Sequence, residues 1–237
     1  IQLESGLQTV AIRDIAIQKR ENDLVLASFG RGFYILDDYS TLRELTPENL
    51  DKDAHIFPIK TALEYIPSSP LGLRGRGHQG ESFYLGKNPA FGATFRYHIK
   101  ESTLTAKETR IKATEDGVIT YPTHDEFFIE DNEESAFLLF IVKDDNGKEV
   151  RKIKTGANAG MNSVTWNLRY PTTSPITLSP SQPGRYSDAD EGPLALPGNY
   201  TVSFYLCNNG TVNKIGNEQS FEIKALENSS LAKLRSI

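Results

Sequence analysis

Hydrophobic residues in the first forty positions fall into three short runs. The runs cover residues 10–17, 24–28 and 33–36, and turn-forming residues such as Asn22 and Gly30 separate them. Strands this short, with turn residues about every eight to ten positions, are typical of an antiparallel meander. Three strands cannot protect both faces of their own sheet, so we expect this meander to be one blade of a β-propeller whose other blades lie upstream.

A short helix and a connector are predicted next. Thr46 precedes Pro47, and a capping residue followed by proline at the first helical position predicts a helix that ends near Asp53. Glycine and proline then crowd residues 65–90, which indicates a connector rather than a core element.

Alternation of apolar and polar residues begins at residue 93 and predicts a second unit made of strands. Residues 93–99 alternate, residues 136–142 form a continuous apolar run, and Asn146-Gly147 predicts a type I′ turn into a return strand over residues 150–153. Further alternation covers residues 164–168, 200–204 and 221–223. At least six such strands predict an all-β chain with an immunoglobulin-like antiparallel β-sandwich. The expected core residues are Phe95, Tyr97, Phe140, Trp166, Val202 and Phe204.

Two segments interrupt the strand pattern. Residues 102–134 are acidic and without clear alternation, so we expect a helical or loop insertion there. Residues 171–197 contain six prolines and are expected to form a surface loop at one end of the sandwich. The predicted organisation is therefore a blade with a short helix (1–60), a connector (61–90), a sandwich (91–225) and a tail (226–237).

Composition and charge disfavour two classes of function, nucleic-acid binding and membrane spanning. The formal net charge of −5 disfavours a nucleic-acid partner, because phosphate binding needs clustered basic residues. No apolar stretch approaches the roughly 20 residues of a membrane-spanning helix, so no membrane span is expected. The chain starts at Ile1 without a signal-peptide pattern, and we therefore interpret it as a fragment of a longer protein.

No residue pattern in the chain predicts catalysis or a cofactor. Residues 75–80 match G-x-G-x-x-G, but neither a strand before them nor a helix after them is expected. The four histidines are scattered, without metal-binding spacing. Asp37 and Asp38 end a strand and could face a propeller mouth, but adjacent strand residues point to opposite faces, so they are not expected to act as a catalytic pair of carboxylates. We expect them to cap the turn instead.

Two features leave a binding role open. The acidic residues 125–134 lack the spacing of a calcium loop and are expected to form a solvated face, with calcium as the alternative. In the proline-rich loop, Tyr186 and the preceding Tyr170 are candidates for contact with carbohydrate or a partner protein. The competing interpretation is that this loop packs on the blade and fixes the angle between the two units.

Several motifs carry a family resemblance over nearly the whole chain. Residues 13–17, 22–26 and 30–38, the last ending in Ile35-Leu36-Asp37-Asp38, resemble the final blade of bacterial BNR-repeat, sortilin-type propeller proteins, which are often grouped with glycosyl hydrolases. Ser28-Phe29 stands where that family commonly has Thr-His. Residues 80–84 and 88–93 resemble the family's entry into its C-terminal immunoglobulin-like domain, and residues 160–169 and 195–202 resemble flagellar hook-capping-type immunoglobulin modules.

The resemblance implies an accessory role. It implies a non-catalytic C-terminal module that supports an upstream propeller of the same parent chain, in a secreted or periplasmic protein. Two alternatives stay open: a part of a sialidase-like glycoside hydrolase whose active site lies mainly in the propeller, and a sandwich that binds carbohydrate or protein. No arginine triad or Asp-box of a sialidase maps onto this chain.

Overall fold

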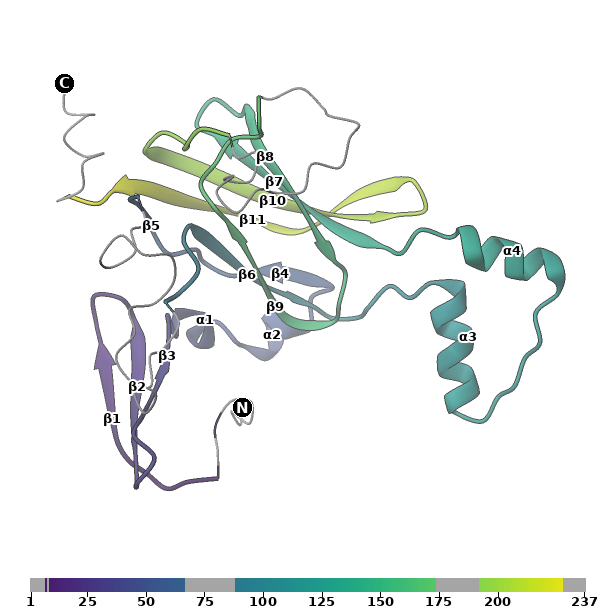
Figure 1. The fold of residues 1–237 in the computed structure, drawn as a ribbon, viewed down its shortest axis with the longest axis horizontal. Coiled ribbons are helices and arrows are strands. Elements are labelled where there is room, and N and C mark those ends of the chain that lie inside the picture. The colour runs from purple at the N-terminus through teal and green to yellow at the C-terminus, as the bar shows by residue number, and fades with distance from the viewer. Residues whose placement is uncertain (1–6, 8, 67–87, 174–191, 228–237) are drawn as a thin grey trace, which may run out of the picture.

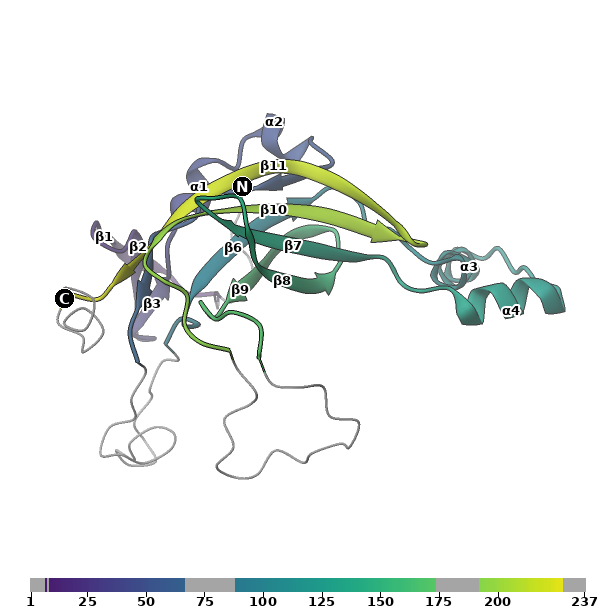
Figure 2. The same cartoon turned by 90° about the horizontal axis from the view of Figure 1, so that it is seen from above.

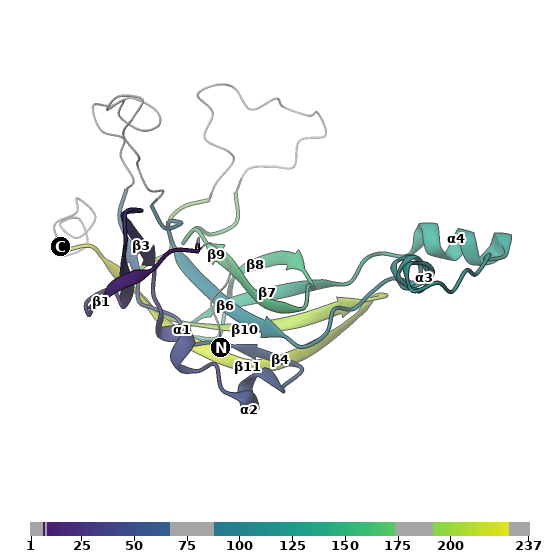
Figure 3. The same cartoon turned by 90° about the horizontal axis from the view of Figure 1, so that it is seen from below.

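The computed structural model describes residues 7, 9–66, 88–173 and 192–227, which form an all-β molecule with a few short helices (Figure 1). A small sheet lies at one end, two packed sheets form the centre, and a helical hairpin projects from the other end (Figures 2 and 3). The predicted fold class, a sandwich preceded by a separate small sheet, is confirmed.

The small sheet is the predicted meander. Its strands are β1 (Ile12–Gln18), β2 (Asp23–Ser28) and β3 (Phe33–Leu36), in the order β1-β2-β3 with both pairs antiparallel. We call this three-stranded sheet the blade. Two short helices follow it, α1 (Ser40–Arg43) and α2 (Pro47–Leu50). The side chain of Thr46 accepts a hydrogen bond from the Asn49 N–H, so the predicted cap is confirmed, although the helix ends at Leu50 instead of near Asp53.

Two sheets make the sandwich. One has the order β5-β11-β10-β7-β8 and the other the order β4-β6-β9. All pairs are antiparallel except β5 with β11, which run parallel. The strands are β4 (Ala54–Ile56), β5 (Ala62–Glu64), β6 (Ala93–Ile99), β7 (Phe137–Asp144), β8 (Glu149–Gly156), β9 (Gly160–Trp166), β10 (Gly198–Asn208) and β11 (Thr211–Ala225).

The sandwich begins earlier in the chain than the expected residue 91. Strand β4 pairs with β6, and β5 pairs with β11, so residues assigned above to the blade and the connector contribute to both sheets. Burial explains the difference: β4 is buried on both sides, and such a three-residue strand shows no alternation. Residues 67–87, the greater part of the expected connector, lie outside the described residues.

The core lies between the two sheets. All six residues expected in it are buried, and Trp166 is only 1% exposed. The rings of Phe140 and Phe204 stack at 5.3 Å, and Trp166 meets Tyr200 edge-on at 5.6 Å. The Tyr200 hydroxyl donates to the Leu196 carbonyl at 2.6 Å, four residues upstream, a contact that resembles the tyrosine corner of immunoglobulin-like sandwiches.

A side chain joins the two sheets at one edge. The Asn217 amide on β11 accepts a hydrogen bond from the Ile56 N–H at 2.9 Å and donates to the Ile56 carbonyl at 3.0 Å. The side chain thereby replaces a backbone partner for β4. Gly216 beside it has φ +63°, and a Cβ there would lie 2.7 Å from the Phe204 ring, so this approach requires glycine.

The turn between β7 and β8 is not the predicted type I′ turn. Gly147 has φ +75°, but Asn146 does not have the positive φ that this turn type requires. The Asp144 carboxylate accepts hydrogen bonds from the N–H groups of Asn146 and Lys148, each at 2.9 Å, and holds a longer loop. The two positive φ values occur instead at Asn209 and Gly210, between β10 and β11.

The expected insertion at residues 102–134 forms a helical hairpin, which we call the arm. It consists of α3 (Ala106–Glu115) and α4 (His124–Asn132). Each helix begins with a reciprocal capping box, Thr105 with Glu108 and Thr123 with Glu126. The arm lies at the end of the sandwich opposite the blade in all three views (Figures 1–3).

Candidate functional site

The blade meets the sandwich at the end of strand β3. Asp38 follows this strand with φ +50°, and its side chain is 9% exposed. Its Oδ1 accepts hydrogen bonds from the backbone N–H and the hydroxyl of Ser40, and its own N–H donates to the Asp23 carboxylate at 3.0 Å. The expectation that Asp38 caps the turn is therefore confirmed, and its second oxygen faces the sandwich.

Arg96 of β6 reaches this second oxygen. Its Nη1 contacts Asp38 Oδ2 at 2.5 Å, and its Nη2 donates to the Asp37 carbonyl at 3.2 Å. Arg96 lies on the outer face of β6, because buried Phe95 and Tyr97 flank it along the strand. One guanidinium thus fastens the sandwich to both residues of the Asp37-Asp38 pair.

A second ion pair lies at the other end of the contact. Lys60 pairs with Glu21 in the β1–β2 turn and also donates to the Glu21 carbonyl at 3.1 Å. The hydrogen bond from Lys60 lowers the pKa of the Glu21 carboxyl below its ordinary value. Glu21 is therefore held ionised at neutral pH and is unsuited to donating a proton.

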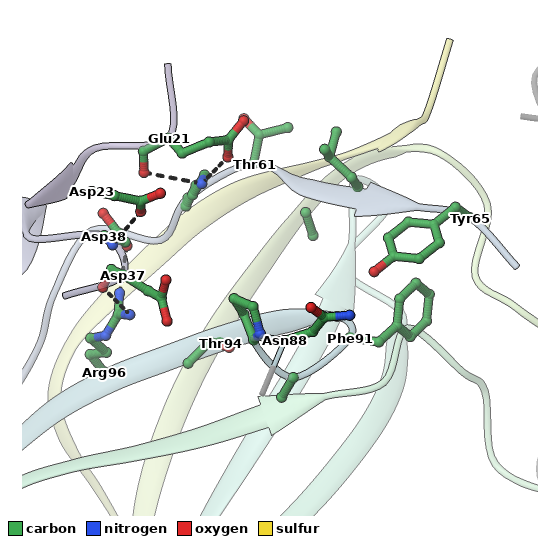
Figure 4. A pocket seen from close by; sticks show the side chains of 16 residues that line it. Glu21, Asp23, Asp37, Asp38, Thr61, Tyr65, Asn88, Phe91, Thr94 and Arg96 are labelled. Atoms are coloured by element: carbon green, nitrogen blue, oxygen red, sulfur yellow. Dashed lines mark hydrogen bonds and ion pairs between the residues drawn. The ribbon is translucent and has the colours of Figure 1, made fainter. Parts of the chain in front are cut away.

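A cleft of about 330 Å³ is lined by the residues of both ion pairs (Figure 4). Carboxylates of the blade line one side, and Tyr65 and Phe91, whose rings meet edge-on at 5.0 Å, line the other. The carboxylates are those of Glu21, Asp23, Asp37 and Asp38. Two of these four are engaged by cations of the sandwich, so the arrangement favours fastening the two units over acid–base chemistry.

Of the two tyrosines proposed for ligand contact, Tyr170 is described and Tyr186 lies outside the described residues. Tyr170 is half-buried and packs against the core. Burial, and after it the neighbouring Tyr170, raises the pKa of the Tyr200 hydroxyl above its ordinary range. These contacts favour a packing role for Tyr170. The ends of its loop are joined, since the Tyr170 N–H donates to the Pro193 carbonyl at 2.9 Å.

The residues that fasten the two units were not found from the sequence. Arg96 occupies a polar position of an alternating strand, a pattern that any solvent-exposed residue satisfies. Lys60 follows a buried three-residue strand, and nothing near it in sequence points to Glu21. The sequence feature that pointed toward this contact was the Asp37-Asp38 pair at the end of a strand.

Metal binding finds no support in the part of the chain that the structure describes. Among the described residues, no three His, Cys, Asp or Glu side chains are placed to hold a metal ion, and the acidic residues 125–134 lie largely on α4. Within the same residues, no helix has the length and apolar character needed to cross a bilayer.

Comparisons with known proteins give one distant structural likeness. No protein-family model and no curated protein sequence matches the chain. The crystal structure of dimeric latent PorU from Porphyromonas gingivalis aligns with 86% of this chain at a TM-score of 0.35 and 10% identity. The alignment spans 12% of the PorU chain, and a likeness this weak carries no functional assignment.

Proposed function

We propose that this chain is a non-catalytic accessory module that attaches a β-sandwich to a β-propeller in the same parent protein. In this proposal the blade packs against neighbouring propeller blades, and Arg96 and Lys60 hold the sandwich at a fixed angle to them. The single observation that carries the proposal is the distribution of apolar residues over both faces of the blade.

The strand register shows which blade residues share a face. Residues directly opposite on paired strands point to the same side of a sheet. Ile15 lies opposite Leu26, and Leu26 opposite Tyr34, so these three define one face. Neighbouring positions define the other face, where Ala16 lies opposite Val25 and Val25 opposite Ile35.

Both faces expose large apolar side chains. Ile15 is 61% exposed on the first face, whereas Ile35 is 62% and Phe33 74% exposed on the second. A two-layer domain buries one face of a sheet and leaves the other polar. Apolar residues on both faces are expected of a sheet packed between two others, as propeller blades are.

The sequence motifs support the same parent protein. The blade residues resemble the last blade of BNR-repeat, sortilin-type proteins, and the hydrogen bond from the Tyr200 hydroxyl to the Leu196 carbonyl resembles the tyrosine corner of immunoglobulin-like domains. We therefore place the module in a secreted or periplasmic protein of that kind, with any glycosidase active site in the upstream propeller. The ion-paired carboxylates of the cleft support the non-catalytic part of the proposal.

Association with the upstream propeller tests the proposal. The parent chain up to this module and the module itself are produced separately and mixed, and complex formation is measured by analytical ultracentrifugation. We expect a complex that is lost when one apolar residue on each face is made acidic, in the Ile15→Asp/Ile35→Asp variant. Val212→Asp, at a 59% exposed site near the β10–β11 turn, is the matched control and should leave the complex intact.

Catalysis is tested on the same samples. The module alone should hydrolyse none of a panel of aryl glycosides, whatever the parent does. Turnover by the isolated module, or a complex that survives the double substitution, would contradict the proposal.

A further inference from the structure

The arm exposes an apolar surface that the proposed function does not use. Neither helix of the arm has a buried residue. Eight large apolar side chains of the arm are exposed: Leu104, Ile111, Val118, Ile119, Tyr121, Phe127, Phe128 and Ile129. Exposed large apolar side chains concentrated in one projecting segment indicate an interaction surface.

The arm is nevertheless a defined structure. Its helices are held together by a two-pronged ion pair, in which Arg110 Nε contacts Glu130 Oε1 at 2.9 Å and Arg110 Nη2 contacts Oε2 at 2.7 Å. The Arg110 guanidinium also lies over the Phe127 ring at 5.2 Å. Together with the two capping boxes, these contacts present the apolar side chains on a preformed support.

A groove runs between the two helices. Its volume is about 510 Å³. On α3 it is lined by the small residues Ala106, Thr109 and Ala113, which follow helical spacing along one face, and on α4 by Ile129. The Arg110–Glu130 ion pair and the Glu126 carboxylate also line it. Small residues on one helix allow another helix to approach closely, and a third helix laid here would bury apolar surface that two helices leave open.

The charge of the arm indicates the charge of the partner that it would bind. Residues 102–134 carry nine acidic and three basic side chains, against a net charge of −5 for the whole chain. The acidic residues are Glu108, Glu115, Asp116, Asp125, Glu126, Glu130, Asp131, Glu133 and Glu134, and the basic ones are Lys107, Arg110 and Lys112. An acidic surface attracts a basic partner and repels anionic membranes.

We propose that the arm docks a basic amphipathic α-helix of a partner protein, with the apolar face of that helix in the α3–α4 groove and its cationic residues against the carboxylates. This recognition mode is that of helix-in-groove complexes. It is independent of the blade, which lies at the other end of the molecule (Figure 3).

Model peptides test this with the full chain. Three fluorescein-labelled helical peptides are titrated by anisotropy: a Lys/Leu amphipathic helix, a Glu/Leu helix with the same apolar pattern, and a Lys/Leu peptide scrambled to remove the apolar face. We expect the first to bind at least tenfold more tightly than either of the others. We also expect its affinity to fall when NaCl is raised from 50 to 300 mM.

Two substitutions in the groove locate the binding site. Ile129→Ser removes an apolar wall, and Ala113→Gln fills the groove while keeping a helix-favouring residue; each should weaken the first peptide at least fivefold. Val212→Ser, an exposed apolar residue outside the arm, should leave its affinity unchanged. Circular dichroism checks that the helices remain in both groove variants.

Each opposite result overturns the inference. If the scrambled peptide bound as tightly as the Lys/Leu helix, binding would depend on charge alone and not on an apolar helix face. If the Glu/Leu peptide bound as tightly, binding would depend on apolar contact alone and not on a basic partner. The groove would also not be the binding site if the Lys/Leu helix did not bind, or if Val212→Ser weakened its binding as much as the two groove substitutions do.

Discussion

At the scale of single residues, Gly92 shows how closely the backbone packs just before strand β6. It has φ +124°, and a Cβ there would lie 1.9 Å from the Trp166 carbonyl oxygen. Both the dihedral angle and the close contact require glycine.

Gly92→Ala is expected to lower the free energy of unfolding by about 2–4 kcal/mol, because backbone strain and overpacking add. Gly210→Ala is the matched control, since Gly210 has φ +75° but nothing within 4 Å of the added Cβ. Gly210→Ala should lower the free energy of unfolding by about 1 kcal/mol, because only the positive φ angle is unfavourable for alanine there. Urea unfolding measures both, and equal costs would show that the Trp166 contact is unimportant.

Buried His55 makes stability depend on pH. It is 7% exposed, and neither ring nitrogen has a hydrogen-bond partner among the described residues. Burial, with a smaller effect of Lys52, lowers the pKa of His55 below its ordinary 6.5. The unfolded chain therefore binds a proton that the folded protein excludes, so the free energy of unfolding falls as pH drops below about 6.5.

Substitution of His55 should reduce this fall. Urea unfolding at pH 7.5 and pH 5.0 is expected to show a smaller loss of stability in His55→Leu than in the unmodified chain. His124→Leu removes a 97% exposed histidine and should leave the loss unchanged. A His55→Leu variant that loses as much stability as the unmodified chain would contradict the assignment.

At the scale of elements, the arm is expected to be independent of the sandwich. Replacing residues 105–133 by a short Gly-Ser linker removes no core side chain, so the free energy of unfolding should change by less than about 1 kcal/mol. Trp166→Ala, which removes a core ring, should lower it by about 3–5 kcal/mol. Thermal and urea unfolding check both, and a large loss on removing the arm would show that it supports the sandwich.

The strands show how far the sequence predicts the elements. The alternation of β6 and the apolar run of β7 predicted the positions of these strands and their buried sides. The prediction succeeds because apolar residues in a strand occupy the buried positions and polar residues the exposed ones. The type of the β7–β8 turn was not predictable from Asn146-Gly147, because the Asp144 carboxylate competes for the turn's N–H groups. The ion pairs of the cleft join residues distant in sequence, and sequence periodicity contains no signal for them.

At the scale of the whole molecule, the Arg96–Asp38 ion pair is one of the two that hold the blade to the sandwich. Arg96→Ala leaves the nearly buried Asp38 carboxylate without its cation and should lower stability by about 1–3 kcal/mol. It should also speed proteolysis between residues 37 and 54, where the blade joins the sandwich. Lys100→Ala breaks the exposed pair with Asp51 and should change neither property. Equal proteolysis of the two variants would mean that Arg96 does not fasten the units.

The link between β4 and β11 also dictates an order of events during synthesis. Ile56 and Asn217 are 161 residues apart, so β4 gains its partner on β11 only after a further 161 residues have been made. At a ribosomal rate of about 5–20 residues per second, that interval lasts roughly ten to thirty seconds. During that interval β4 can pair with β6, but the Asn217 side chain that joins β4 to the second sheet has not yet been made.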